Sequence, residues 1–385
     1  MNETVTPYNN FQNTRHFASL DGLRCFCILA VLWHHSIRPE NLPLQSLTRG
    51  FLGVDMFFVL SGFLITALLI RERTTHGNIS LRAFWARRSL RIFPIYYLML
   101  FVLAIMYLVT AAPDDPNRIF FFDNLIYNLT YTSNWNLTPE TNLSPLWSLA
   151  TEEQFYLLWP LAEVFASKHI KLVFYFTLLT ISQAFNFGFL YALLPTNTAT
   201  YLSQLEVMQC SFTPILLGVG LAYLLHHKPS FNLLASLLHH RFTPFIITII
   251  LFALIECTPA QIIGYPRLLI QLAMTALTAA VVIREDHFAR PILAFKPIVF
   301  VGAISYGLYL YHPWTLHFTR ILYQKMIAEQ SWPLIDFILG SIISISIAAL
   351  SFKLLETPIL KLKHRFSRTL TSESKSPILE SSKTP

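Results

Sequence analysis

The sequence predicts an all-α fold: a polytopic integral membrane bundle of about ten transmembrane helices, with both termini in the cytoplasm. Of its 385 residues, 54% are hydrophobic and only 13% are charged, whereas about a quarter of the residues of a soluble domain are charged. Apolar runs of roughly 20 residues recur along the chain, and each is long enough to cross a bilayer as a helix. The runs are continuously apolar rather than alternating, which disfavours transmembrane strands.

The apolar runs define the expected spans, and the longest connection between them is an outer loop at about 112–150. We place the spans at residues 20–37, 51–70, 92–111, 151–167, 172–194, 207–225, 243–257, 264–283, 298–317 and 333–355.

The distribution of Lys and Arg predicts the orientation of these spans. With the N-terminus in the cytoplasm, the outer loops hold few basic residues, and the cytoplasmic loops hold most of them, including Arg71, Arg73, Arg82, Arg87, Arg88, Arg91, Lys168 and Lys171. The net charge of +7 is therefore explained by membrane topology, and we expect the lipid bilayer, not a nucleic acid, as a partner.

Composition divides the chain into three parts. We expect a cytoplasmic N-terminal segment at 1–15, a membrane domain at 16–360, and a cytoplasmic tail at 361–385 that is first basic and then disordered. No repeat and no appended soluble domain is expected. The four cysteines lie in or at the ends of apolar segments without a CxxC pair, so we interpret them as packing residues and expect no metal site; they are Cys25, Cys27, Cys210 and Cys257.

The first span carries ionisable residues within an apolar segment. Arg24 and His35 are eleven residues apart, which places them on one helical face with about 16 Å between them along the axis. His34 points about 80° away from that face. Asp21 lies three residues before Arg24 and can pair with its guanidinium. Snorkelling to the interface explains a histidine near a helix end better than it explains Arg24, so a functional role is favoured.

The second and third spans add further charged positions. Asp55 is an ionisable group near the outer end of the second span, which indicates a polar network or a functional site. Gly53 and Gly62 are interpreted as contacts with a neighbouring helix. At the cytoplasmic mouth of the third span, Arg88 and Arg91 present neighbouring guanidinium groups that suit a phosphate. The positive-inside rule explains the same arginines without a ligand, so composition leaves both interpretations open.

The fourth span begins with a cluster of polar residues. Ser148 and Thr151 are expected to be N-caps, with Glu152 and Glu153 in the first turn, where the helix dipole favours anions. Glu153 and Tyr156 share one side, at the outer level expected for the histidines of the first span. A carboxylate there can orient an imidazole or raise its basicity. The alternative interpretation is that these polar residues only cap the N-terminus of the helix and have no role at a site.

The ninth span carries a polar stripe. Ser305, Tyr309 and His312 recur at i, i+4 and i+7 in its outer half, and Pro313 frees the backbone carbonyl of Tyr309. An aromatic belt at the membrane interface explains the neighbouring aromatic residues, but not this inward stripe.

Five phrases of the sequence together resemble the membrane-bound acyltransferase-3 family, and the resemblance extends from "LDGLR" to "ETPIL". They are "LDGLRCFCILAVLWHH", "GFLGVDMFFVLSGFLI", "FWARRSLRIFPIYYLML", "LWSLATEEQFYLLWP" and "ISYGLYLYHPW". This family moves acyl groups, commonly acetyl from acetyl-coenzyme A, onto hydroxyls of extracytoplasmic carbohydrates. Typical acceptors are lipopolysaccharide O-antigen, exopolysaccharide, peptidoglycan and small glycosides. The resemblance implies a multi-pass enzyme of the bacterial inner (cytoplasmic) membrane, whose 16–360 region is the acyltransferase domain.

The resemblance also implies roles for particular residues. The family's Arg/Lys-x10-His motif falls on Arg24 and His35, its Arg-x-x-Arg motif on Arg88 and Arg91, and its Glu-x-x-Tyr motif on Glu153 and Tyr156. This sequence has Cys25 where a small Gly or Ala is usual, and we do not expect the soluble hydrolase-like domain that some members append.

The implied mechanism is transfer across the bilayer from acetyl-CoA, which acts as a substrate, with no bound cofactor. Arg88 and Arg91 hold the coenzyme A phosphates, and Arg24 guides the pantetheine arm or binds a donor carbonyl or phosphate. His35 takes the proton of the acceptor hydroxyl. Glu153 and Tyr156 orient His35 or stabilise its charged form, and the other residues of the expected site form a supporting polar network: Asp55, Ser305, Tyr309 and His312.

Three other classes of protein fit parts of the pattern. A transporter or flippase of an envelope glycan precursor also has many spans with buried charges, and inverted repeats would favour it, but none is evident. A haem protein would use His34 or His35 together with His312. A non-catalytic scaffold of an envelope assembly is the third alternative. The sequence leaves the acceptor sugar and the oligomeric state undefined.

Overall fold

The computed structural model describes residues 7–36, 44–135, 143, 145–189, 212–259, 262–326 and 333–362. Within these ranges every regular element is helical and no strand occurs, which confirms the all-α class. The first half of the chain forms α1 (Pro7–Asn13), α2 (Ala18–Ser36), α3 (Gln45–Thr48), α4 (Leu52–His76), α5 (Leu81–Thr110), α6 (Pro116–Asp123), α7 (Leu125–Leu129), the short turn η2 (Ser133–Trp135), α8 (Leu146–Phe165) and α9 (Lys168–Asn186).

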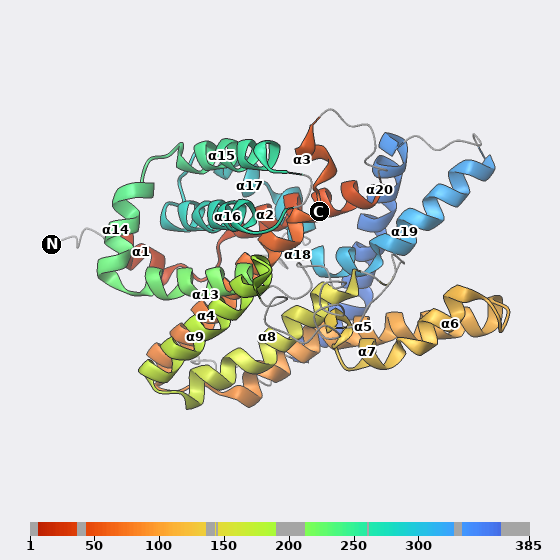
Figure 1. Cartoon of the computed structure of the whole chain (residues 1–385), viewed down its shortest axis with the longest axis horizontal. Coiled ribbons are helices and arrows are strands. Elements are labelled where there is room, and N and C mark those ends of the chain that lie inside the picture. Colours follow the sequence, from red (N-terminus) through yellow and green to blue (C-terminus); the bar gives the residue numbers. More distant parts are fainter. Residues whose placement is uncertain are drawn as a thin grey trace, which may run out of the picture.

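The second half continues with α13 (Thr213–His226), α14 (Lys228–Leu238), α15 (Thr243–Cys257), α16 (Tyr265–Ile283), α17 (Arg290–Leu293), α18 (Lys296–Ala303), α19 (Ser305–Met326), α20 (Pro333–Ser351), the π-helical turn η3 (Phe352–Glu356) and α21 (Thr357–Lys361). Figure 1 shows α14 at one end of the molecule and α6 at the other, with the remaining helices bundled between them.

Four of the described helices are long and apolar enough to cross a membrane: α4, α5, α16, and the continuous run from α20 to α21. Two bent pairs, α1 with α2 and α14 with α15, raise this number to six if each pair is one span. A helix lies in each of the ten expected ranges, as far as the described residues reach. Length and composition thus support a multi-pass membrane protein, and the count of ten spans stays a prediction.

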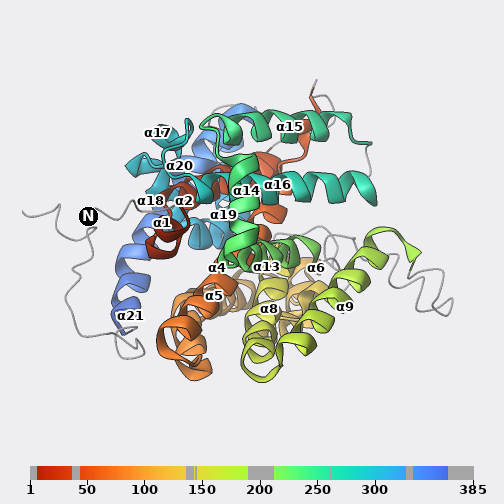
Figure 2. The same ribbon diagram turned by 90° about the vertical axis from the view of Figure 1, so that its left-hand side faces the viewer.

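Helix α2 lies in the middle of the bundle and packs against α4, α16, α18, α19 and α20. Figures 1 and 2 show it enclosed by these helices in both views. Its apolar side chains are buried, among them Leu20, Ile28 and Leu32. This central position explains why ionisable residues on α2 reach the interior of the protein.

Glycines allow α4 and α13 to cross at close range. A Cβ atom added to Gly62 would lie 2.0 Å from the carbonyl oxygen of Ile215, and one added to Gly218 would lie 2.1 Å from that of Val59. Both distances are far below van der Waals contact, so each position requires a residue without a side chain. The expected packing role of Gly62 is confirmed, and Gly53 likewise abuts the carbonyl of Cys27.

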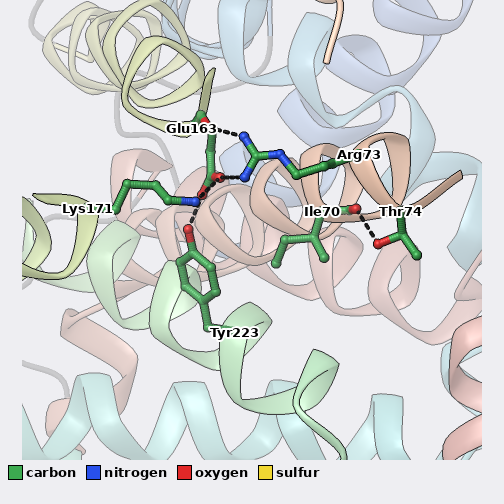
Figure 3. A network of polar contacts seen from close by, with 6 residues as sticks. All are labelled: Ile70, Arg73, Thr74, Glu163, Lys171 and Tyr223. Carbon is green, nitrogen blue, oxygen red and sulfur yellow. Dashed lines mark hydrogen bonds and ion pairs between the residues drawn. The ribbon is translucent and has the colours of Figure 1, made fainter. Parts of the chain in front are cut away.

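One end of the bundle is joined by a buried acidic residue, Glu163, which is 1% exposed. Its carboxylate accepts a hydrogen bond from Lys171 Nζ at 3.0 Å and lies 3.4 Å from Arg73 Nη1, and it also accepts from the Tyr223 hydroxyl. Figure 3 shows these side chains converging from the ends of α4, α8 and α13 and the start of α9. The contacts tie four helices together at one level.

The other end is joined by three further groups of contacts. Arg267 lies 3.3 Å from Asp55, and Arg320 lies 3.3 Å from Asp336. Arg49 donates hydrogen bonds to three backbone carbonyls at the end of α15. Ile255 lies in the last turn of that helix, and Thr258 and Pro259 follow it.

Several boundaries differ from those expected. Helix α5 begins at Leu81, eleven residues before the expected span, because Ser80 caps it by accepting from the Ala83 amide. The last span continues through a π-helical turn to Lys361. The outer loop at 112–150 contains short helices, α6 and α7, in its described part.

Some expectations fall wholly or partly outside the described residues: the tail beyond 362, the first six residues, Cys210, and parts of the fifth and sixth spans. The other three cysteines have free thiols.

Candidate active site

A cavity of about 80 Å³ lies between α2, α4, α5, α8 and α19. Each of these helices contributes at least one polar side chain to its wall. The lining residues are Arg24, Val54, Phe57, Phe58, Ser61, Arg88, Arg91, Ile92, Ser148, Leu149, Glu152, Tyr156, Ser305, Tyr306 and Tyr309. The structure thus brings together six of the expected site residues: Arg24, Arg88, Arg91, Tyr156, Ser305 and Tyr309.

Three guanidinium groups and one carboxylate line this cavity. Arg24 has an acidic partner, because its Nη1 lies 3.3 Å from Asp21 Oδ1. Arg88 lies over the ring of Tyr156, 5.4 Å from its centroid. Neither Arg88 nor Arg91 has a hydrogen bond or an ion pair to any described residue. Charged groups that lose water without gaining a partner are costly, so the excess of positive charge favours an anionic ligand.

The helical phase of α5 distinguishes these two arginines within the group Arg87, Arg88 and Arg91. Arg88 and Arg91 are three residues apart and face the cavity, whereas Arg87 points elsewhere and lies 3.3 Å from Glu72. The positive-inside rule does not distinguish among the three arginines. Their different environments therefore support the ligand interpretation for Arg88 and Arg91.

The carboxylate in the cavity wall is Glu152, which the sequence did not single out as a site residue. Ser61 donates a hydrogen bond to Glu152 at 2.5 Å, and Tyr156 donates to Ser61 at 3.1 Å. The residue expected in this role, Glu153, is absent from the lining. The signal in the sequence was the spacing of Ser148, Glu152 and Tyr156 at i, i+4 and i+8, which places them on one face of a helix.

The expected capping of α8 is wrong. The helix begins at Leu146, with Pro145 as its N-cap residue, and neither Ser148 nor Thr151 caps it. Ser148 instead hydrogen bonds to the Tyr309 hydroxyl at 2.7 Å, and that hydroxyl donates to the carbonyl of Pro145 at 3.0 Å. Because the helix starts earlier, both glutamates lie in its second turn.

Two histidines lie together beyond the cavity. His312 is one helical turn past Tyr309 on α19 and is fully buried. Its ring centroid is 4.9 Å from that of His35, which is exposed at the end of α2. The His34 ring also lies beside that of His35, with centroids 5.2 Å apart, and its Nδ1 is 3.0 Å from the carbonyl oxygen of Thr48. No hydrogen bond between His35 and Glu153 occurs in the described structure, so the partner expected for His35 is not the one found beside it.

Asp55 belongs to a different network. It is fully buried, lies 3.3 Å from Arg267, and accepts a hydrogen bond from Gln271 at 2.9 Å. These contacts join α4 to α16 and lie apart from the cavity lining. Of the two interpretations of Asp55, the structure favours the polar network. In the described ranges, no group of three or more His, Cys, Asp or Glu side chains is arranged to hold a metal ion.

Apolar helices of membrane-spanning length around a cavity lined by three arginines define the class, a multi-pass membrane protein with a charged internal cavity. The chain belongs to the acyltransferase family Acyl_transf_3, because residues 17–353 match the model of its acyltransferase domain. No solved structure matches the chain significantly.

Curated relatives carry names that describe O-acetyltransferases. The chain is 30% identical to "O-acetyltransferase OatA" of Staphylococcus aureus (strain NCTC 8325 / PS 47) over 365 residues, which cover 90% of this chain and 58% of the relative. It is 29% identical to "Putative peptidoglycan O-acetyltransferase YrhL" of Bacillus subtilis (strain 168) over 372 residues, covering 91% and 56%. It is 30% identical over 380 residues to a "Putative O-acetyltransferase" of Staphylococcus aureus (strain COL), covering 94% and 60%. The chain therefore spans somewhat more than half the length of these relatives.

Proposed function

We propose that this chain is a membrane O-acyltransferase that moves an acetyl group from cytoplasmic acetyl-CoA to a hydroxyl of an extracytoplasmic carbohydrate. The observation that carries the proposal is the cavity in which Arg24, Arg88 and Arg91 converge, two of them without an acidic partner among the described residues. An acyltransferase domain that uses coenzyme A must bind its phosphates, and guanidinium groups bind phosphate with geometric specificity.

The proposed orientation places both termini in the cytoplasm of a bacterium and the chain in its inner membrane. The contacts of Glu163 support it, because they unite helix ends that the positive-inside rule assigns to the cytoplasmic side, those of Arg73 and Lys171. The ion pair between Arg320 and Asp336 likewise unites two ends assigned to the outer side. Ten spans remain part of this proposal.

The donor enters from the cytoplasmic side in this scheme. Arg88 and Arg91 hold its phosphates, and Arg24 binds a phosphate or carbonyl oxygen deeper in the cavity. The cavity of about 80 Å³ is much smaller than the 300–1,000 Å³ or so that small-molecule sites usually occupy. Donor binding is therefore expected to separate the surrounding helices.

The chemistry takes place at His35, about 16 Å from Arg24 along the continuous helix α2. The neutral imidazole accepts the proton of the acceptor hydroxyl as its oxygen attacks the thioester carbonyl. The carbon–sulfur bond then breaks, and the coenzyme A thiolate leaves and takes up the proton. A positioned base contributes about 10²–10⁴-fold to such a reaction. The exposed position of His35 gives an acceptor access from the outer side.

The acceptor is an envelope carbohydrate polymer in this proposal. The sequence resemblance permits lipopolysaccharide O-antigen and exopolysaccharide as well as peptidoglycan. The name of the Bacillus subtilis relative specifies peptidoglycan, so we favour peptidoglycan as the acceptor.

The test uses the full chain, purified and reconstituted in nanodiscs, with acetyl-labelled acetyl-CoA. Peptidoglycan fragments, lipopolysaccharide and an exopolysaccharide are offered separately, and the label recovered in each is measured. We expect label in the peptidoglycan fragments, and a loss of about 10²–10⁴-fold for His35→Ala. Full activity of that variant, or the absence of label in every carbohydrate, would contradict the proposal.

A further inference from the structure

The tautomer of His312 is defined by its surroundings. Pro313 has no amide hydrogen, so the carbonyl of Tyr309 lacks the helical hydrogen bond it would otherwise receive. His312 Nδ1 lies 2.6 Å from that carbonyl oxygen. Because a carbonyl only accepts, Nδ1 carries the hydrogen and donates it. His312 Nε2 therefore holds an unprotonated lone pair.

That lone pair has no partner. His312 is fully buried, and its Nε2 atom has no hydrogen-bond partner in the described part of the chain. Buried polar atoms of native proteins are nearly always paired, and each exception calls for an explanation. The Nε2 atom of His312 can therefore accept a hydrogen bond, and no described residue donates one to it.

The side chain beside it is His35. The two ring centroids are 4.9 Å apart, although no hydrogen bond joins the rings in the described structure, so a rotation of the His35 ring or one bridging water molecule would be needed to pair them. His35 has no hydrogen bond to another described residue, whereas the neighbouring His34 is occupied by the carbonyl of Thr48. The His35 ring can therefore donate the hydrogen bond that His312 Nε2 can accept.

We propose that His312 is a positioning residue that receives a hydrogen bond from one ring nitrogen of His35 and so leaves the lone pair of the other nitrogen free for the acceptor hydroxyl. The inference rests on the proposed role of His35 as the base. The Tyr309 carbonyl accepts a hydrogen bond from His312 and so orients its ring. His312 in turn would accept a hydrogen bond from His35 and orient that ring. This assigns to a neutral imidazole the orienting role that the sequence assigned to Glu153.

The pair also accommodates the charge that appears during transfer. When His35 takes the proton of the hydroxyl, its ring becomes a cation that donates to His312 Nε2. The proton is later released to the departing thiolate, so His312 gains and loses none. Tyr309 contributes to the cavity lining as well, and this places the pair directly beyond the donor cavity.

The test measures the protonated nitrogen of His35 together with activity. The full chain in nanodiscs carries ¹⁵N-labelled histidine, and the His35 signals are assigned by their loss in His35→Gln. We compare wild type with His312→Phe, which cannot accept a hydrogen bond, and with His312→Gln, whose amide oxygen can. We expect a single His35 tautomer in wild type and a mixture in His312→Phe, with partial restoration in His312→Gln.

Among these variants, kcat should fall as the His35 tautomers become mixed. His312→Phe should lower kcat by about 10²-fold and leave the KM for acetyl-CoA unchanged, and His312→Gln should recover part of kcat. Pro313→Ala restores an amide donor to the Tyr309 carbonyl and should also mix the His35 tautomers, which provides a second test if His312→Phe fails to fold. An unchanged His35 tautomer in His312→Phe and in Pro313→Ala would overturn the inference. A wild-type protein without transferase activity would overturn the proposed function instead, since the spectrum does not depend on activity.

Discussion

Arg88 and Arg91 differ from the other arginines of α5 in what surrounds them. Both line the cavity without an acidic partner in the part of the chain that the structure describes, whereas Arg82 is exposed at the start of the helix. Replacing either Arg88 or Arg91 with Ala should remove a charged hydrogen bond to phosphate worth about 1.5–3 kcal/mol. The KM for acetyl-CoA should then rise by roughly 10- to 100-fold, as measured by initial rates. Arg82→Ala is the control, and an equal rise in that variant would return all three arginines to a purely topological role.

Glu152 and Glu153 are adjacent in sequence but separate in function by our account. Only Glu152 lines the cavity, where Ser61 donates a hydrogen bond to it at 2.5 Å. Glu152→Gln should reduce transfer, because Glu152 is the only carboxylate among the described residues that line the cavity and so balances the arginines. Glu153→Gln should have the smaller effect. Parallel kcat/KM measurements decide the matter, and a larger loss in Glu153→Gln would support the motif-based assignment.

The sequence predicted the residues whose partners lie on the same helix better than those whose partners lie on others. The shared face of Arg24 and His35 follows from helix geometry alone, as does the pairing of Arg24 with Asp21. Glu152 was not singled out because the three-residue spacing to Tyr156 and the family motif both pointed to Glu153. His312 was expected in a polar stripe and a supporting network, and the haem alternative paired it with His34 or His35, but a contact with His35 in particular depends on how α19 packs against α2.

Close helix crossings make particular glycines essential to the bundle. Gly218→Ala would place a Cβ atom 2.1 Å from the carbonyl oxygen of Val59 and force α13 away from α4. Overpacking of this kind costs about 1–3 kcal/mol. The melting temperature in detergent should fall.

Gly220→Ala is the matched control on the same helix. Its added Cβ atom would meet only the hydroxyl end of Tyr175, at 2.6 Å, and that flexible side chain can move. An equal fall in melting temperature for both variants would show that the backbone contact is not the cause.

The helix boundaries show a similar limit of prediction. Within the described residues, the apolar pattern located a helix in each expected range. It placed the start of α5 too late, since polar and basic residues form the first turns of that helix. That error matters for the site, because Arg88 and Arg91 lie on the helix itself rather than in a loop. Local capping by Ser80 decides the boundary, and hydropathy does not report it.

The whole bundle depends on buried polar contacts at its two ends. Glu163 is 1% exposed and binds Arg73, Lys171 and Tyr223. Glu163→Ala leaves these groups without their acidic partner, and breaking a buried pair costs about 3–5 kcal/mol; the partial exposure of Arg73 favours the lower end. Thermal unfolding in nanodiscs should show a clear loss of stability.

Asp286→Ala provides the comparison for this prediction. Asp286 pairs with Arg284 at 2.8 Å, but the Asp286 side chain is 67% exposed, and exposed pairs contribute about 0–1 kcal/mol. A loss of stability in Asp286→Ala that matches the loss in Glu163→Ala would mean that burial does not set the strength of these contacts.

The central proposal is that a donor bound at the arginines of the cavity is attacked at His35 by an acceptor on the other side of the membrane. Proteoliposomes with the chain inserted in one orientation test it most directly, with acetyl-labelled acetyl-CoA added on the side of Arg88 and the carbohydrate acceptor enclosed on the side of His35. We predict that label appears in the enclosed acceptor. At a donor concentration below the wild-type KM, the label should fall about 10- to 100-fold in Arg88→Ala and about 10²–10⁴-fold in His35→Ala. Transfer only when donor and acceptor share one compartment would contradict the account.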